Sequence, residues 1–190
     1  MKKLVKIILW TFSSLIVLVL LFMFVVWPIM KSNTKKHSPE QQITYTQSDL
    51  ELSVFYCSPS KKDRKIFGEL VPYGEVWRTG ANEASTFTTN KDLVIDNKEL
   101  TKGTYTLWTI PGEKTWEVIF NSEMYDWGVN FSDQKAARIP EHDALVTTVQ
   151  VANSLTSTED FTISFSEVGD SIIMTLAWEN AVIPVLLQEK

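Results

Sequence analysis

The distribution of charged residues divides the chain into two unlike parts. No charged residue lies between Lys6 and Lys31, and the 21 residues Ile7–Trp27 contain only one Thr and two Ser among apolar side chains. As a helix this run would be about 31 Å long, which matches the hydrocarbon core of a bilayer. The pattern predicts a short basic N-terminus over residues 1–6 and a transmembrane signal anchor over residues 7–29, with Ile7 to Trp27 in contact with the membrane.

A cleaved signal peptide and a buried core helix are the alternatives for this run. A cleaved signal has a shorter apolar region and ends in small residues, whereas this run is long and ends in Val25-Val26-Trp27-Pro28. A core helix of a soluble domain is usually shorter and not apolar on every side. The length therefore favours the anchor.

The remainder of the chain shows the period of a half-buried sheet. Residues 30–42 are polar and predict a tether, and from residue 43 short apolar alternations are broken every eight to twelve residues by Gly, Pro or Asn. The clearest pair is 103–110 and 116–120, separated by Pro111-Gly112-Glu113. Residues 43–190 are therefore predicted to form an all-β domain of nine or ten strands, a two-layer antiparallel β-sandwich of jelly-roll or immunoglobulin-like type.

Two positions carry additional expectations about this sheet. Pro184 lacks a backbone N–H, so the final strand that contains it is expected at a sheet edge. Residues 121–140 lose the alternation, and a connection of this length is either functional or a cap over an open end of the core.

Charge and cysteine content exclude several classes of function. Six of the 18 Lys and Arg precede the first acidic residue, Glu40, so 12 basic and 23 acidic residues leave a formal charge of −11 from that point on. Such a domain repels phosphate backbones, which argues against nucleic-acid binding. Cys57 is the only cysteine and is expected to be a buried small residue, because it cannot form an internal disulfide.

The densest group of polar side chains lies within Trp77-Arg78-Thr79-Gly80-Ala81-Asn82-Glu83-Ala84. Trp77, Arg78, Asn82 and Glu83 could form a pocket in which the guanidinium binds a carboxylate or a sugar hydroxyl beside an indole face. Alternatively, Arg78 pairs with an internal carboxylate and Asn82 satisfies a sharp turn, as buried polar groups require. Trp127, in the irregular segment, is the tryptophan most expected to be exposed to a ligand.

This run and several motifs elsewhere in the chain resemble those of a known family. Ile66-Phe67-Gly68, Val71-Pro72-Tyr73-Gly74, the Trp77–Ala84 run, Gly103-Thr104-Tyr105, Ile110-Pro111-Gly112 and Trp178-Glu179 resemble the bacterial family called domain of unknown function 2911. The resemblance implies an all-β envelope or secreted domain and supplies no activity, ligand or catalytic residue. Together with the anchor it predicts a single-pass protein of the bacterial inner membrane with its C-terminal domain in the periplasm or extracytoplasmic space.

The motifs of common enzymes and cofactor sites are missing from the sequence. It has no Gly-rich phosphate loop, no Gly-x-Ser-x-Gly, no His-Glu-x-x-His and no Cys-x-x-Cys. Neighbouring strand residues point to opposite faces, so Glu141-His142-Asp143 is not expected to bind a metal. We therefore expect no cofactor, no metal and a non-catalytic binding or scaffolding module whose ligand is a glycan, a peptide or an envelope protein. The alternative is a carboxylate-dependent hydrolase that uses Glu83 on an envelope glycan or peptide.

Overall fold

The computed structural model describes residues 2–169 and 171–190. The chain divides into two units, Met1–His37 and Ser38–Lys190. The first unit consists of helix α1 (Lys2–Leu21), a short π-helix η1 (Phe22–Val26) and helix α2 (Trp27–Lys35). Together they are long and apolar enough over Lys3–Lys35 to cross a membrane, and none of the most apolar window is buried. The uncharged run of the sequence is thus helical throughout.

The predicted polar tether contains more regular structure than its composition indicated. Helix α2 continues to Lys35, where the C-terminal turn is closed by the Lys36 N–H bonding to the Asn33 and Thr34 carbonyls. The first strand already begins at Glu40. Only residues 36–39 therefore lie between helix and strand.

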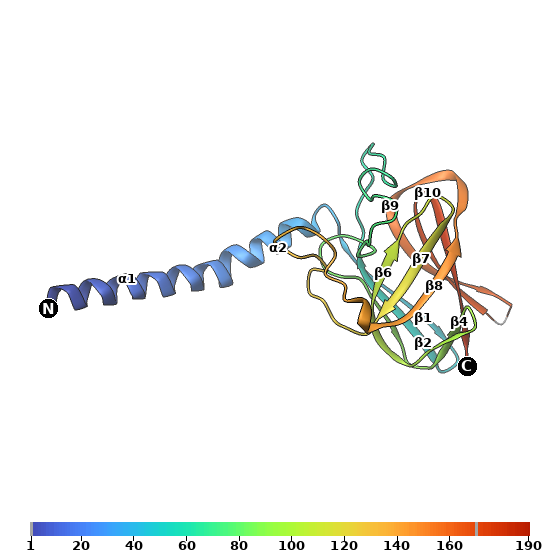
Figure 1. Ribbon diagram of the computed structural model, residues 1–190, viewed down its shortest axis with the longest axis horizontal. Helices are drawn as coiled ribbons and strands as arrows, with labels where there is room; N and C mark the ends of the chain where they lie inside the picture. Colours follow the sequence, from blue (N-terminus) through green and yellow to red (C-terminus); the bar gives the residue numbers. More distant parts are fainter. Residues whose placement is uncertain (1, 170) are drawn as a thin grey trace. The chain divides into compact units, whose positions relative to one another are not determined.

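The second unit is the predicted all-β domain, and Figure 1 shows its strands. In the part of the chain that the structure describes, the strands are β1 (Glu40–Gln47), β2 (Leu50–Cys57), β3 (Thr86–Thr89), β4 (Leu93–Ile95), β5 (Lys98–Leu100), β6 (Gly103–Ile110), β7 (Thr115–Asn121), β8 (Asp143–Gln150), β9 (Ala152–Val168) and β10 (Ser171–Glu189). A 3-10 turn, η2 (Pro140–His142), precedes β8.

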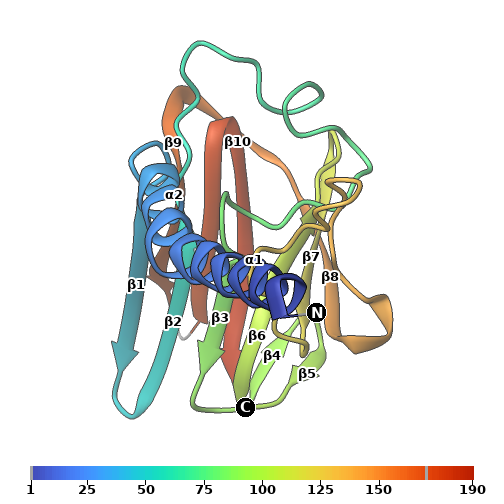
Figure 2. The same cartoon turned by 90° about the vertical axis from the view of Figure 1, so that its left-hand side faces the viewer.

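The strands form two antiparallel sheets that pack as a sandwich. One sheet has the order β1-β2-β3-β6-β7-β8 and the other β5-β4-β10-β9. Figure 2 shows β1, β2, β3, β6, β7 and β8 side by side, with β10 behind them. The chain crosses to the four-stranded sheet between β3 and β4, returns between β5 and β6, and crosses again at Val151, between β8 and β9. The prediction of a two-layer antiparallel sandwich is confirmed.

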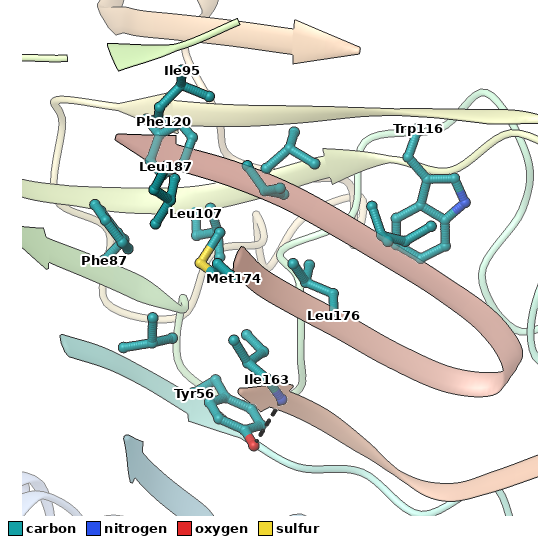
Figure 3. Close-up of a cluster of buried hydrophobic side chains, with 14 of the residues drawn as sticks. Tyr56, Phe87, Ile95, Leu107, Trp116, Phe120, Ile163, Met174, Leu176 and Leu187 are labelled. Atoms are coloured by element: carbon teal, nitrogen blue, oxygen red, sulfur yellow. Dashed lines mark hydrogen bonds between the residues drawn. The ribbon is translucent and has the colours of Figure 1, made fainter. Parts of the chain in front are cut away.

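The core lies between the two sheets and follows the alternation of the sequence. Phe87, Leu107 and Phe120 of one sheet and Met174 and Leu187 of the other are all buried in one cluster (Figure 3). Figure 3 also shows Tyr56 on β2 reaching β9, where its hydroxyl accepts the Ile163 N–H at 3.1 Å. This bond satisfies the buried hydroxyl and joins the two sheets.

Strand β10 differs from the expectation for Pro184. It runs from Ser171 to Glu189 as one strand, with register shifts on either side of Glu179. Pro184 does not lie on an edge strand, because β10 runs between β4 and β9. The paired residues explain why proline is tolerated: the ladder with β9 ends at Val182 and that with β4 involves Gln188 and Glu189.

A second buried layer covers the outer face of the six-stranded sheet. Trp108 and Ile119 are fully buried although they alternate with the core residues of β6 and β7. Tyr125, from residues 122–139 of the irregular segment, packs edge-on against Trp108 with ring centroids 5.2 Å apart. The segment therefore covers a sheet face, and it does so without forming a strand.

Candidate functional site

The Trp77–Ala84 segment is hydrogen-bonded to two strands of the six-stranded sheet, to β6 at its first residue and to β2 further on. Trp77 forms an isolated bridge with Thr109 on β6, through hydrogen bonds of 2.7 and 2.9 Å in the two directions. The Ala81 N–H bonds to the Cys57 carbonyl at the end of β2. Thr79, between these points, and Asn82, directly after the second, adopt the left-handed conformation, with φ of 55° and 57°. The segment is a tight, strained loop of the kind found where the surrounding structure dictates the backbone.

Trp77 and Arg78 point to opposite sides of this loop. The Trp77 indole is half-buried and packs against the core, with ring centroids 4.9 Å from Phe161 and 5.9 Å from Trp178. Its Nε1–H donates to the Gly80 carbonyl at 3.1 Å. The structure therefore separates Trp77 from the other predicted site residues and gives its indole a packing role.

Arg78, Asn82 and Glu83 gather around Cys57, and we call these four residues the Arg78 cluster. The Cys57 thiol donates to Glu83 Oε2 at 3.3 Å. The Asn82 side-chain amide donates to the Ser38 carbonyl at 3.3 Å, and Arg78 Nη1 donates to the Trp127 carbonyl at 2.8 Å. Arg78 and Glu83 are half-buried, whereas Cys57 and Asn82 are buried. The cluster is a polar group enclosed by protein atoms.

Burial and the Glu83 carboxylate set the electrostatics of the cluster. Burial, followed by the hydrogen bond to Glu83 and the charge of that carboxylate, raises the pKa of the Cys57 thiol to about 11. Burial also lowers the pKa of Arg78, an effect opposed by its electrostatic interactions with Cys57 and with the Glu83 carboxylate. The thiol therefore stays protonated at neutral pH, which makes it a poor nucleophile because the thiolate is the reactive form.

The irregular segment covers the cluster through Trp127 and Gly128. A Cβ added at Gly128 would lie 3.2 Å from Arg78 Cβ and 3.3 Å from Ala84 Cβ, and its φ is +71°. Trp127 itself is half-buried. Its backbone carbonyl, rather than its indole, contacts Arg78. Only a glycine lets the segment approach this closely in that conformation.

Hydrogen bonds hold the rest of the segment to β7 and β8. The Asn121 amide donates to the Ile139 carbonyl at 2.9 Å and to Asp143 Oδ1 at 2.8 Å. Arg138 makes a two-pronged contact with the Asp143 carboxylate, and each side chain is only 12% exposed. Asp143 is thus engaged by Arg138 and Asn121. Among residues 2–169 and 171–190 no group of three His, Cys, Asp or Glu side chains is arranged to hold a metal ion.

Cys57 is the member of the cluster that the sequence interpretation left out. It was predicted to be a small buried residue, and it is fully buried. The alternation of Leu52, Val54 and Tyr56 into the core places Cys57 on the opposite face of β2, away from the main core. That parity was visible in the sequence, but it does not show that the loop carrying Glu83 passes over the same point.

Fold and site together define a β-sandwich domain that follows an apolar, membrane-length helix in the same chain. Residues 38–187 match the family described as Protein of unknown function (DUF2911). The match spans the whole sandwich and most of the chain, so the chain belongs to this family and the resemblance is confirmed. No curated protein and no solved structure matches the chain.

Proposed function

We propose that the protein is a non-catalytic binding or scaffolding module that its N-terminal helix holds in the bacterial inner membrane, with the sandwich on the extracytoplasmic side. The observation that carries the proposal is the exposure of the helix: large apolar residues from Leu4 to Met30 are exposed, many by half or more. Leaving a single Leu, Ile or Phe in water rather than in an apolar phase costs about 1.5–3 kcal/mol. A bilayer removes this cost along the whole helix.

The chemistry of the Arg78 cluster supports binding or scaffolding over catalysis. A hydrolase built on Glu83 would need that carboxylate to reach a substrate, but Glu83 is half-buried and accepts a hydrogen bond from the Cys57 thiol. Arg78 in turn donates to the Trp127 carbonyl. The hydrogen bonds of the cluster therefore stabilise the fold rather than supply a reactive group. The proposed partner of the module is a glycan, a peptide or an envelope protein.

The charge distribution supports a domain that stands clear of the lipid. Lysines flank the apolar run on both sides, and the chain from Glu40 onward carries a formal charge of −11 (12 basic and 23 acidic residues). Anionic headgroups attract the flanking lysines and repel the acidic domain. The lysines therefore position the ends of the helix, while the domain remains available to partners in the aqueous phase.

Fractionation of the full chain, expressed in a bacterium, tests the proposal. We expect the protein to stay in the membrane pellet after alkaline carbonate and salt washes. External protease should digest the sandwich in spheroplasts and not in intact cells. Protection in spheroplasts, or release by the washes, would overturn it.

A matched pair of variants tests the role of the helix. Val17→Arg combined with Leu18→Arg adds two charges near the centre of the span, each costing about 2.5–3.5 kcal/mol for insertion. This variant should move to the soluble fraction, whereas Val17→Leu should remain in the membrane. Equal membrane retention of both would contradict the anchor.

A further inference from the structure

A pocket at one end of the sandwich shares no lining residue with the Arg78 cluster. It has a volume of about 230 Å³ and lies between the 65–73 loop, the turn at 112–113 and the irregular point of β10 at 179–181. These stretches are far apart in the sequence, yet each contains residues of the family-like motifs: Phe67, Tyr73, Gly112 and Glu179. We call this the end pocket.

Glu179 is held toward the end pocket by a break in strand alternation. Its φ is 51°, a left-handed conformation that is uncommon for a residue other than glycine, and the β9–β10 register shifts on both sides of it. Trp178 before it points into the core, so a regular strand would turn Glu179 outward to solvent. In β10 the buried positions are even-numbered up to Trp178 and odd-numbered from Ile183 on, so the irregularity lies between them. Within it the Glu179 Oε2 accepts the Phe67 N–H at 3.2 Å. Bulges that re-aim a side chain in this way are over-represented at binding sites.

Aromatic rings form the apolar wall of the end pocket. Tyr73 is 41% exposed, whereas Phe67 and Trp116 are almost fully buried behind the surface. A Cβ at Gly68 would lie 2.9 Å from Tyr73 Cε2, so the Tyr73 ring lies directly on the Gly68 backbone. The glycine, with φ of +87°, positions the ring and leaves it partly accessible.

The frame of the end pocket is held in place by the backbone. The Gly74 N–H donates to the Pro111 carbonyl at 2.8 Å, which joins the loop carrying Tyr73 to the turn between β6 and β7. In that turn a Cβ at Gly112 would lie 2.5 Å from the Thr115 carbonyl oxygen, so the chain is closely packed there. The site is therefore preorganised, which lowers the entropic cost of binding.

The polar groups of the end pocket match a ligand with hydroxyl groups. Glu113 and Glu179 only accept hydrogen bonds, and Lys65, which also lies 3.7 Å from Glu69, only donates. The amides of Asn153 and Asn180 do both, although the Asn180 Nδ2 already donates to the Ser154 carbonyl at 2.7 Å. A hydroxyl group donates and accepts, so it can pair with each of them. The lining charges of two carboxylates and one ammonium partly cancel, which suits an uncharged ligand better than an ion.

The size limits how much of a ligand the end pocket encloses. Sites for drug-sized ligands measure about 300–1,000 Å³, and this pocket is smaller. It has room for about one ring, with an apolar face against Tyr73 and hydroxyls toward Glu179. A pyranose ring has such an apolar C–H face and a polar edge.

We propose that the end pocket binds one neutral pyranose ring, either a free monosaccharide or a residue of a glycan. This inference rests on the proposed binding function and names the ligand class for it. Glu179 hydrogen-bonds the hydroxyls and Tyr73 stacks on the ring.

Saturation-transfer NMR on the purified full chain tests the inference. The protein is kept in a detergent without a sugar headgroup, and the probes are glucose, galactose, mannose and N-acetylglucosamine with a tetrasaccharide of each, at millimolar concentration. We expect saturation of the ring C–H protons of at least one probe. Comparable affinity for monosaccharide and tetrasaccharide assigns a free sugar, and tighter binding of the tetrasaccharide assigns a glycan. Absence of transfer to every probe overturns the proposal.

Matched variants show whether the signal comes from the end pocket. Glu179→Gln keeps an acceptor for the Phe67 N–H but loses the charge, so we expect binding at least about tenfold weaker. Tyr73→Ala should abolish transfer, whereas Tyr73→Phe and Glu75→Gln, an exposed carboxylate of the same loop, should bind as the parent does. Unchanged binding in both Glu179→Gln and Tyr73→Ala, with folding checked by circular dichroism, would overturn the assignment. If no sugar binds but the protein fractionates with the membrane as expected, the proposed sugar site is wrong and the proposed membrane anchor stands.

Discussion

Replacing Trp77 with alanine tests whether the first residue of the Trp77–Ala84 segment serves packing or a ligand. The indole has four aromatic neighbours: Phe67, Trp116, Phe161 and Trp178, with ring centroids 4.9–6.2 Å away. These rings come from the 58–85 loop and from both sheets. Trp77 is therefore the shared contact of the aromatic cluster that closes one end of the core.

The expected loss of stability follows from these contacts. Truncating a large aromatic residue in a core costs about 3–5 kcal/mol, because the neighbours collapse only partly into the space. The lost bond from Nε1 to the Gly80 carbonyl adds about 1 kcal/mol. Because Trp77 is only half-buried, we reduce the sum of these two losses to about 3–4 kcal/mol. For a domain of this size, that corresponds to a fall in Tm of about 6–16 °C.

Urea denaturation of the sandwich, residues 38–190, followed by circular dichroism, measures this loss. Trp77→Phe keeps a ring in the cluster and should lose about half as much stability as Trp77→Ala. Trp127→Ala removes a half-buried indole outside the core cluster and should cost less than either. If Trp77→Ala lowers the free energy of unfolding by less than about 1 kcal/mol, the packing argument is wrong and Trp77 regains its place as a candidate ligand contact.

Three further changes probe the Arg78 cluster and the irregular segment that covers it. Gly128→Ala places a Cβ 3.2 Å from Arg78 Cβ at a φ of +71°, so thermal denaturation should show a loss of about 1–3 kcal/mol. Asp143→Ala leaves the Arg138 guanidinium without its carboxylate and should cost about 3 kcal/mol in urea denaturation. The Cys57 pKa is raised from 9.0 to about 11, so the unfolded chain loses this proton first as the pH rises. Stability should then fall between pH 9 and 11 by at most about 1.4 kcal/mol per unit, and less steeply in Cys57→Ala.

The alternation of apolar residues was sufficient to predict the sandwich. Leu52, Val54 and Tyr56, and likewise Trp116, Val118 and Phe120, lie in the core as their spacing indicated. The alternation did not show which strands pair when they are far apart in the sequence. Pro184 illustrates the limit: the rule that excludes proline from inner strands holds for paired residues, and Pro184 lies in β10 between the ladders with β9 and β4.

The sequence named the candidate site residues but did not show how the loop arranges them. In the structure the Trp77 indole packs against the core, whereas Arg78, Asn82 and Glu83 gather around Cys57. That these residues contact a ligand stays a prediction. The end pocket could not be predicted from the sequence. Glu179 reaches it through an irregularity in β10, and the residues Trp178-Glu179-Asn180 contain no glycine or proline that would indicate such an irregularity.

Strain and hydrogen bonding distinguish the two candidate sites. In the Arg78 cluster the left-handed residues, Thr79 and Asn82, shape a loop whose side chains bond to nearby backbone: Asn82 to the Ser38 carbonyl and Arg78 to the Trp127 carbonyl. There the strain is offset by internal contacts. At Glu179 the strained residue accepts one backbone N–H and borders open space with an accessible ring nearby. The proposed pyranose ring would occupy the open space beside Glu179, whereas in the Arg78 cluster protein carbonyls already accept the hydrogen bonds of Arg78 and Asn82.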